Sequence, residues 1–233
     1  MAVASPPFNG FSPDAIQFLA DLAANNDRAW FQPRKADYER LLKEPLEALV
    51  AALAERFEAR GIPLQADPKR SPFRIYRDTR FSKDKSPYKT NIGASFPWVE
   101  RGSRREGAHS NGGYFHFQPG EMFAGGGMWM AEKPTLDAFR KQILDDPDRV
   151  RAALEEPGFV KVFGNVRTHD ELKRVPSGLP ADHPMADYFR WKDIVFGRRL
   201  GVDEVLSPNL PDTIADGYAA AMPVFRFLST LSG

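Results

Sequence analysis

The chain has 233 residues, of which 42% are hydrophobic and 27% are charged, and its formal net charge is only +1. These values are typical of a globular protein that is long enough to bury a sizeable core. The chain contains no cysteine, which excludes a disulfide framework, a thiolate nucleophile and a cysteine-bound zinc site. We expect an N-terminal tail over residues 1–10 and a single domain over residues 11–233.

The sequence also predicts where the protein resides. Its first ten residues, MAVASPPFNG, lack the basic stretch and the following apolar run of a signal peptide. Nowhere does an apolar run approach the ~18 residues that a membrane span requires. We therefore expect a soluble, cytoplasmic protein with no membrane association.

The N-terminal part is predicted to be helical. Residues 11–26 begin with Ser12 as N-cap and Pro13 at the first helical position, and Phe11 and Ile16 are spaced as a hydrophobic staple. A longer helical pattern runs from about residue 33 to residue 60. Its apolar stripe consists of Tyr38, Leu42, Leu46, Leu49, Leu53 and Phe57. Because proline removes a helical hydrogen bond, we expect a kink or break at Pro45, and Gly61 ends the pattern.

Strands are predicted in the next part of the chain. The segments with strand character are 73–77, 92–98, 113–118 and 122–130. The charged stretch 100–111 is expected to be an exposed loop. Alternation places Tyr114, His116 and Gln118 on one face of a strand, and Phe115 and Phe117 on the other, buried face.

Helical patterns return from residue 133. Helices are predicted to begin at Pro134, Pro147 and Pro208, with the last one interrupted at Pro223. Residues 157–182 are interpreted as turn-rich, and 191–196 as a further strand. The predicted fold class is therefore α+β: a mainly antiparallel sheet, from about residues 73–130 plus 190–197, packed with N-terminal and C-terminal helices in a single domain. The 11–60 helices are expected to cover one side of this sheet.

Positive charge is concentrated in one short segment. Residues 69–89 contain eight basic and two acidic residues, a net charge of about +6 in a chain whose total is +1. Such a concentration predicts an anion-binding surface. The candidate anion-binding residues are Arg74, Arg77, Arg80, Lys83, Lys85 and Lys89. The alternative is that Asp78 and Asp84 pair with two of these cations while the others are solvated.

Arg77 is the most specific of these candidates. Strand alternation would place it on the same face as Phe73 and Ile75, which we expect to be buried. A guanidinium in that position requires either a carboxylate partner or a bound anion. Both possibilities remain open at the level of the sequence.

Other polar and aromatic residues could line a pocket near this segment, namely Tyr76, Asp78, Tyr88, Tyr114 and His116. Tyr114, His116 and Gln118, on one polar face, are the best candidates for proton transfer if the protein is an enzyme. The glycines at 125–127 lack the context of a phosphate loop and are interpreted as a bulge or a place of close backbone packing. The four histidines show no metal-ligand spacing, so we expect neither a metal nor a cofactor.

Several stretches resemble one protein family. The run RIYRDTRFSKDKSPYKTNIGASF, and further FNGFSPDAIQFLADLAANNDRAWF, GGYFHFQPGEMFAGGGMW and RVPSGLPADHP, are similar to the family of conserved hypothetical proteins called domain of unknown function 2461. This resemblance covers most of the chain. It implies a cytoplasmic single-domain protein, and it transfers no activity to any residue.

The functional hypothesis preferred from the sequence is binding of an anionic small molecule or single-stranded nucleic acid at the basic segment. The first alternative is an enzyme that acts on a phosphorylated or carboxylated small molecule and uses the same cations to stabilise charge. The second is a docking protein for an acidic partner. Because the segment reads as strand and loop, we expect no sequence-specific recognition of duplex DNA by a groove-reading helix.

Overall fold

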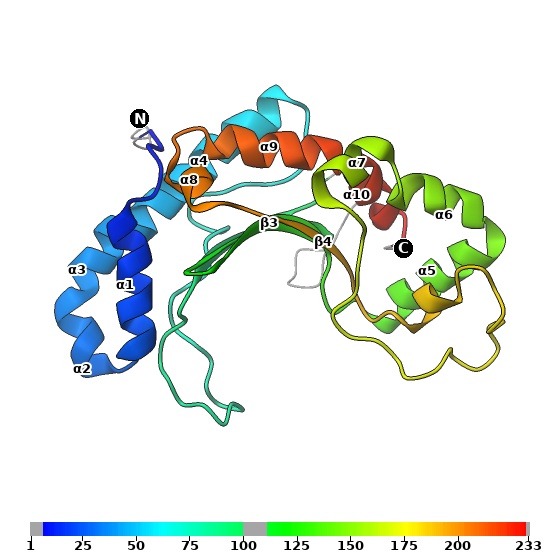
Figure 1. Ribbon diagram of the computed structural model, residues 1–233, viewed down its shortest axis with the longest axis horizontal. Coiled ribbons are helices and arrows are strands. Elements are labelled where there is room, and N and C mark those ends of the chain that lie inside the picture. The colour runs from blue at the N-terminus through cyan, green and yellow to red at the C-terminus, as the bar shows by residue number, and fades with distance from the viewer. Residues whose placement is uncertain (1–6, 100–110, 232–233) are drawn as a thin grey trace.

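The computed structural model describes residues 7–99 and 111–231. The predicted loop over residues 100–111 therefore lies almost entirely outside the described residues. The fold is α+β, as predicted, and is built on an antiparallel sheet with the strand order β1-β2-β3-β4 (Figure 1). The strands are β1 (Ile92–Pro97), β2 (Gly112–Gln118), β3 (Glu121–Met128) and β4 (Ile194–Arg199).

The N-terminal helices follow the predicted pattern closely. They are α1 (Pro13–Ala24), α2 (Arg28–Phe31), the 3-10 turn η1 (Gln32–Arg34), α3 (Lys35–Tyr38), the π-helical turn η2 (Glu39–Lys43) and α4 (Glu44–Ala59). The Ser12 hydroxyl accepts a hydrogen bond from the amide of Ala15, which confirms the predicted N-cap. The predicted interruption near Pro45 takes the form of the π-helical turn that immediately precedes α4.

The C-terminal half contains two α-helices that we did not predict, over residues 157–163 and 202–206. Its helices are α5 (Lys133–Asp145), α6 (Pro147–Leu154), α7 (Pro157–Phe163), the 3-10 turn η3 (Ala186–Arg190), α8 (Val202–Leu206), α9 (Leu210–Ala220) and α10 (Met222–Ser229). The interpretation of residues 157–163 as turn-rich is wrong. Here the Glu156 carboxylate accepts a hydrogen bond from the amide of Phe159, and Gly164 ends the helix with a φ of 72°.

Helices cover one face of the sheet. Phe115 and Phe117 of β2 are fully buried on this face, as predicted. Opposite them lie α4, α9 and α10 (Figure 1). We expected all of the 11–60 helices to cover the sheet, but of these α4 alone lies over it, while α1, α2 and α3 form a lobe at its end. One hydrophobic cluster extends from Phe8 to Leu231, as expected for one domain.

The other face of the sheet is open. It forms the roof of an arch between the lobe of α1 to α3 and the lobe of α5 and α6, while α7 packs on the covered face beside α9 (Figure 1). The outer edges of the sheet are paired with irregular chain. Phe73 donates its amide to the carbonyl of Gly93 beside β1, and Arg167 exchanges two backbone hydrogen bonds with Val195 of β4.

Candidate functional site: the basic hairpin and the open sheet face

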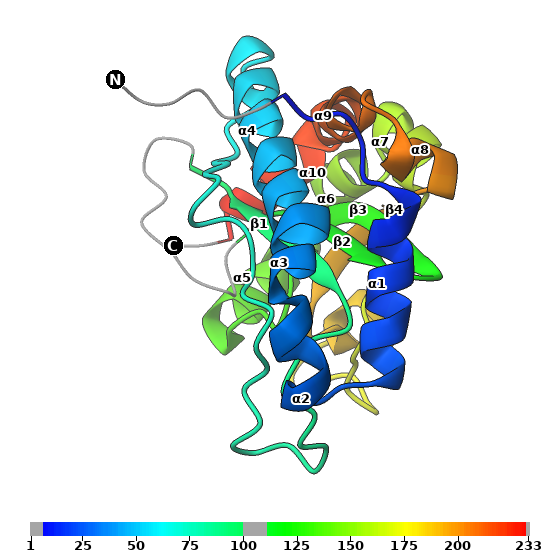
Figure 2. The same ribbon diagram turned by 90° about the vertical axis from the view of Figure 1, so that its left-hand side faces the viewer.

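Residues 69–90, called the basic hairpin below, leave the edge of β1, extend away from the sheet and return (Figures 1 and 2). The prediction of a strand over residues 73–77 is wrong. Only an isolated bridge joins Tyr76 to Tyr88, with a hydrogen bond from the Lys89 amide to the Ile75 carbonyl of 2.8 Å. Pro72 and Pro87 lack an amide hydrogen, and a proline cannot donate to a ladder. The basic segment is therefore a hairpin loop rather than a sheet strand.

The base of the hairpin is fixed to the N-terminal lobe. The Asn26 side-chain amide donates to the carbonyl of Tyr88, and the Asn26 side-chain oxygen accepts from the amide of Tyr88, both at 3.0 Å. The buried ring of Tyr88 stacks on Phe31 with 4.1 Å between the centroids. The turn after α1 thus positions a segment that lies more than sixty residues further along the chain.

Two arginines of the hairpin pair with its two aspartates. Arg77 contacts Asp84 and also donates to the carbonyl of Ser86. Arg80 donates hydrogen bonds to both carboxylate oxygens of Asp78. Hydrogen bonds from Ser86, and then the contact with Arg77, hold the pKa of Asp84 well below its usual range. The bonds from Arg80 lower the pKa of Asp78 to about 2.

The predicted environment of Arg77 is correct in part. Ile75 is buried on the same side and the Arg77 side chain is only 27% exposed, but Phe73 is 42% exposed. Phe73 fails to enter the core because residues 73–77 do not continue the sheet. Arg77 has the carboxylate partner that we considered, and Asp84 itself is exposed.

The other cations of the hairpin have no such partner. Within the hairpin, whose residues are all described, the side chains that form no ion pair with a carboxylate are those of Lys69, Arg74, Lys83, Lys85 and Lys89. The Lys85 ammonium donates to the carbonyl of Thr79, and that of Lys89 lies 5.1 Å from the centroid of the Phe73 ring. Burial, and then the nearby charge of Arg74, lower the pKa of Lys89. The hairpin therefore retains an excess of positive charge.

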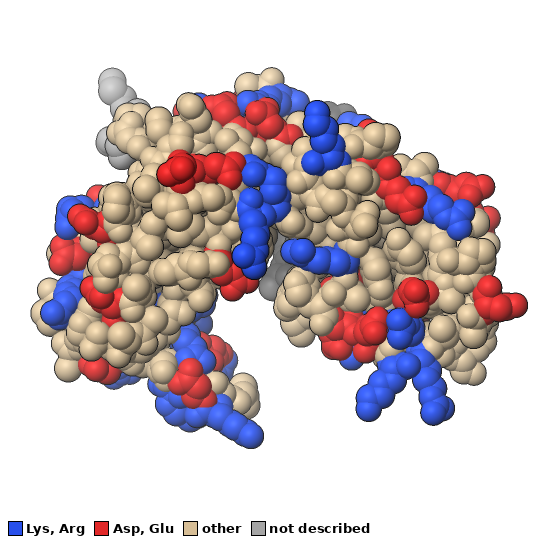
Figure 3. Space-filling model, in the orientation of Figure 1, with Lys and Arg blue, Asp and Glu red and all other residues tan. Residues whose placement is uncertain are grey.

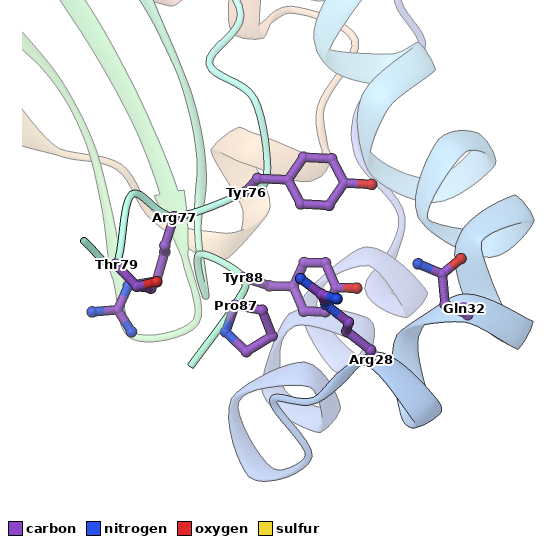
Figure 4. Close-up of a pocket in the computed structure, with 7 residues that line it drawn as sticks. All are labelled: Arg28, Gln32, Tyr76, Arg77, Thr79, Pro87 and Tyr88. Carbon is purple, nitrogen blue, oxygen red and sulfur yellow. The ribbon is translucent and has the colours of Figure 1, made fainter. Parts of the chain in front are cut away.

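A pocket of about 280 Å³ lies between the hairpin and the N-terminal lobe (Figure 4). Its walls are formed by Arg28, Gln32, Tyr76, Arg77, Thr79, Pro87 and Tyr88. The rings of Tyr76 and Tyr88 face the Arg28 and Gln32 side chains, whereas the guanidinium of Arg77 is turned away from them (Figure 4). Arg28 forms no ion pair within the described chain, so it is the cation that this pocket offers to a ligand.

Tyr114 and His116 lie elsewhere, on the open face of the sheet. The Tyr114 hydroxyl is 2.9 Å from Nδ1 of His116, and Asn91 lies near the same nitrogen. Burial raises the pKa of Tyr114 to about 12 and lowers the pKa of His116. Both side chains are therefore neutral at pH 7. Of the five predicted pocket residues, Tyr76 and Tyr88 line the pocket, Asp78 pairs with Arg80, and the other two belong to the sheet.

Two further sequence predictions concern glycines and metals. The glycines of β3 are a place of close packing, since a Cβ on Gly126 would lie 2.9 Å from the Phe225 ring and one on Gly125 would meet the β4 backbone. Within the described residues no group of three or more His, Asp or Glu side chains is arranged to hold a metal ion.

In the same part of the chain, no helix combines the length and the apolar character needed to cross a bilayer.

These features define an α+β protein with an antiparallel sheet, one open sheet face and a projecting basic hairpin. The chain belongs to the family described as conserved hypothetical protein (DUF2461), whose family model matches residues 14–227. The match confirms the resemblance drawn from the sequence and includes both the hairpin and the sheet. We found no match to the chain among curated proteins or among solved structures.

Proposed function

We propose that the protein binds an anionic ligand, phosphorylated or nucleic-acid-like, through the basic hairpin. The observation that carries this proposal is the excess of cations without carboxylate partners on a segment that projects from the body. Like charges held close together repel one another, and a bound polyanion relieves that repulsion. The two internal ion pairs act differently: they hold the shape of the loop that presents the other cations.

Phosphates are the favoured anions because several cations are spread along the hairpin rather than gathered at one point. A single carboxylate would engage one or two of them, whereas a chain of phosphates would reach Arg74, Lys83 and Lys89 together. The absence of cysteine suits a reducing compartment, and we place the protein in the cytoplasm as part of this proposal. The hairpin contains no helix that could enter a DNA groove, so we propose binding through phosphates without duplex sequence recognition.

The test is a titration of a labelled random single strand, and separately of inorganic polyphosphate, at several salt concentrations. We expect affinity to fall steeply with salt, because phosphate binding releases counterions. The double variant Arg74→Gln/Lys83→Gln should weaken binding to both probes and flatten the salt dependence. Its matched control is Arg149→Gln/Lys161→Gln, which removes two cations from α6 and α7 that also form no ion pair in the described chain. No binding of either probe at low salt would refute the proposal.

A second candidate function follows from the close approach of Tyr114 to a neutral His116. A neutral imidazole can accept a proton, so an enzyme acting on a phosphorylated or carboxylated small molecule would find a proton-transfer pair here and cations at the hairpin. Screening phosphomonoesters for turnover by the wild type and by His116→Gln tests this candidate. Turnover that is unchanged in the variant would exclude His116 as the base.

A further inference from the structure

We propose that the open face of the sheet is a platform for the unpaired bases of a single-stranded nucleic acid whose phosphates the basic hairpin holds. This inference rests on the proposed function and adds the class of ligand to it. The platform consists of Phe73, Tyr114, His116 and Phe123, together with Gly125 and Gly197, and is called the aromatic platform below.

Aromatic rings connect the hairpin to the middle of the sheet without a gap. The Phe73 ring, at the base of the hairpin, is 6.0 Å from the Tyr114 ring, which is 5.6 Å from Phe123. Phe123 in turn stacks on His116 at 4.9 Å. These rings are only partly buried, although they lie on a sheet whose other face has an almost fully buried core. Partly exposed rings on a sheet are the surface on which unpaired bases stack, since every base has an apolar face.

Next to the rings the platform is flat. The register aligns Tyr114 with Gly125 and Gly125 with Gly197, and residues paired across antiparallel strands share a face. Two neighbouring strands thus present no side chain beside the rings. The side chain of Arg167 reaches over this part of the sheet, and its guanidinium nitrogen would be 3.3 Å from a Cβ on Gly197. Gly125 itself is buried, so it is at the partly exposed Gly197 that a planar base can approach the backbone closely.

Positive charge borders the platform on two sides. Lys89, with Arg74 near it, lies over Phe73 at the hairpin side. At the opposite side are Arg167 and Arg199, both exposed and without an ion pair in the described chain, and Arg199 is aligned with Phe123. Glu121, at the end of β3, is the acid whose charge acts on Tyr114 and His116, and it is paired with Gln118, outside the rows that carry the rings. Lys and Arg side chains border the hollow of the arch on both of its sides (Figure 3).

The shape favours a single strand over other polyanions. The platform is the roof of an arch, so a flat bilayer surface would meet the lobes before it reached the rings (Figure 1). A duplex hides its bases inside the stack, and the rings would then have nothing to contact. An acidic peptide would pair with the cations but would have no planar group to stack on the rings or to lie against the glycines beside them. A strand with exposed bases uses the rings, the floor and the cations together.

The experiment compares two labelled strands of equal length and charge by fluorescence anisotropy: an oligothymidylate and its abasic counterpart. We expect the oligothymidylate to bind more tightly at the same salt concentration. Phe123→Ala should weaken its binding about fivefold to about a hundredfold, the effect of losing one stacked base, and should leave the abasic strand unaffected. The matched control is Phe81→Ala, which removes a 94% exposed phenylalanine at the hairpin tip, away from the sheet.

A second variant guards against a folding defect in Phe123→Ala. Gly197→Leu adds a side chain to the floor without removing any packing, because its Cβ meets only the flexible end of Arg167 and ordinary contacts with Phe123 and the Ala124 carbonyl. It should keep the wild-type melting temperature and bind the oligothymidylate at least about fivefold more weakly.

Four outcomes overturn the platform. Equal affinity for the two strands would mean that the hairpin binds phosphates but the sheet binds no base, and the proposed function would stand alone. An equal loss in Phe81→Ala would place the base contact at the hairpin tip. Binding of neither strand would remove the proposed function and the platform together. Tighter binding of a poly-glutamate peptide than of the oligothymidylate would favour an acidic protein partner and would also exclude the platform.

Discussion

Asn26 forms two hydrogen bonds with the backbone of Tyr88, in the manner of a residue on a neighbouring strand. The pairing joins the turn after α1 to the base of the basic hairpin. The side chain of Asn26 thus forms hydrogen bonds with both the amide and the carbonyl of Tyr88. This contact fixes the position of the hairpin relative to α2 and the pocket.

Asn26→Ala should therefore destabilise the protein by about 1–3 kcal/mol, because it leaves a partly buried amide and carbonyl without partners. Chemical denaturation measures the change. Hydrogen exchange should also become faster at the Tyr88 amide. The control is Asn25→Ala, whose side chain donates only to the Asp21 carbonyl at the exposed end of α1, and which should cost less. Equal costs for the two variants would mean that the Tyr88 contact contributes little.

The hairpin should respond to Arg77→Met by local loosening rather than by global unfolding. Arg77 joins Asp84 to the Ser86 carbonyl, but Asp84 is exposed, so no carboxylate is left unpaired in the core. Hydrogen exchange over residues 75–90 should accelerate while the melting temperature changes little. Limited proteolysis provides an independent measurement, with new cleavage expected within the hairpin. A large fall in melting temperature would show that the core depends on this ion pair.

Lowering the pH should reduce stability through His116. Burial lowers the pKa of His116 in the folded chain, whereas the unfolded chain has the ordinary value of ~6.5. The unfolded state therefore binds the proton more readily, and the stabilisation present above ~6.5 is lost as the pH falls through the folded-state pKa. Glu121 and Gln118 oppose the shift without reversing it. Denaturation curves of the wild type and His116→Gln should diverge across this window, and parallel curves would contradict the assignment.

Two glycines in the sheet should tolerate alanine very differently. A Cβ on Gly113 would lie 2.8 Å from the fully buried Tyr218 ring, whose hydroxyl donates to the Tyr114 carbonyl. Because that ring has no room to move, Gly113→Ala should cost about 1–3 kcal/mol. Gly197→Ala, on the open face, should be nearly neutral. Thermal melts of both variants test the assignment of the two faces, and similar costs would contradict it.

The local parts of the fold could be predicted from sequence because their causes are local. Ser12 and Pro13 specify the start of α1 with neighbouring atoms, and the alternation around Phe115 and Phe117 identifies the buried face of β2. The helix α7 could also have been predicted in this way, since Glu156 and Pro157 at its start and Gly164 at its end are ordinary helix signals. We missed this helix because the mostly apolar residues 159–163 form a short run, which we interpreted as part of a turn-rich segment.

The site could be predicted only in part, because its geometry depends on contacts between distant segments. The concentration of charge identifies the basic hairpin, and the pairing of Asp78 and Asp84 with two arginines was one of the alternatives considered. No sequence pattern reveals that Asn26 holds Tyr88, or that Arg28 and Gln32 complete a pocket with it. The separation of Tyr114 and His116 from that pocket follows from the register of the sheet, which the sequence does not specify.

The pairing of both sheet edges with irregular chain has a consequence for self-association. Unpaired edge strands recruit strands from other copies and seed aggregates. Here Phe73 and Ser71 occupy hydrogen-bonding groups of β1, and Arg167 occupies those of β4. A second copy would have to displace the base of the hairpin, or the segment after α7, before it could extend the sheet. The protein can thus leave one sheet face uncovered by helices while offering other chains little edge on which an amyloid-like stack could grow.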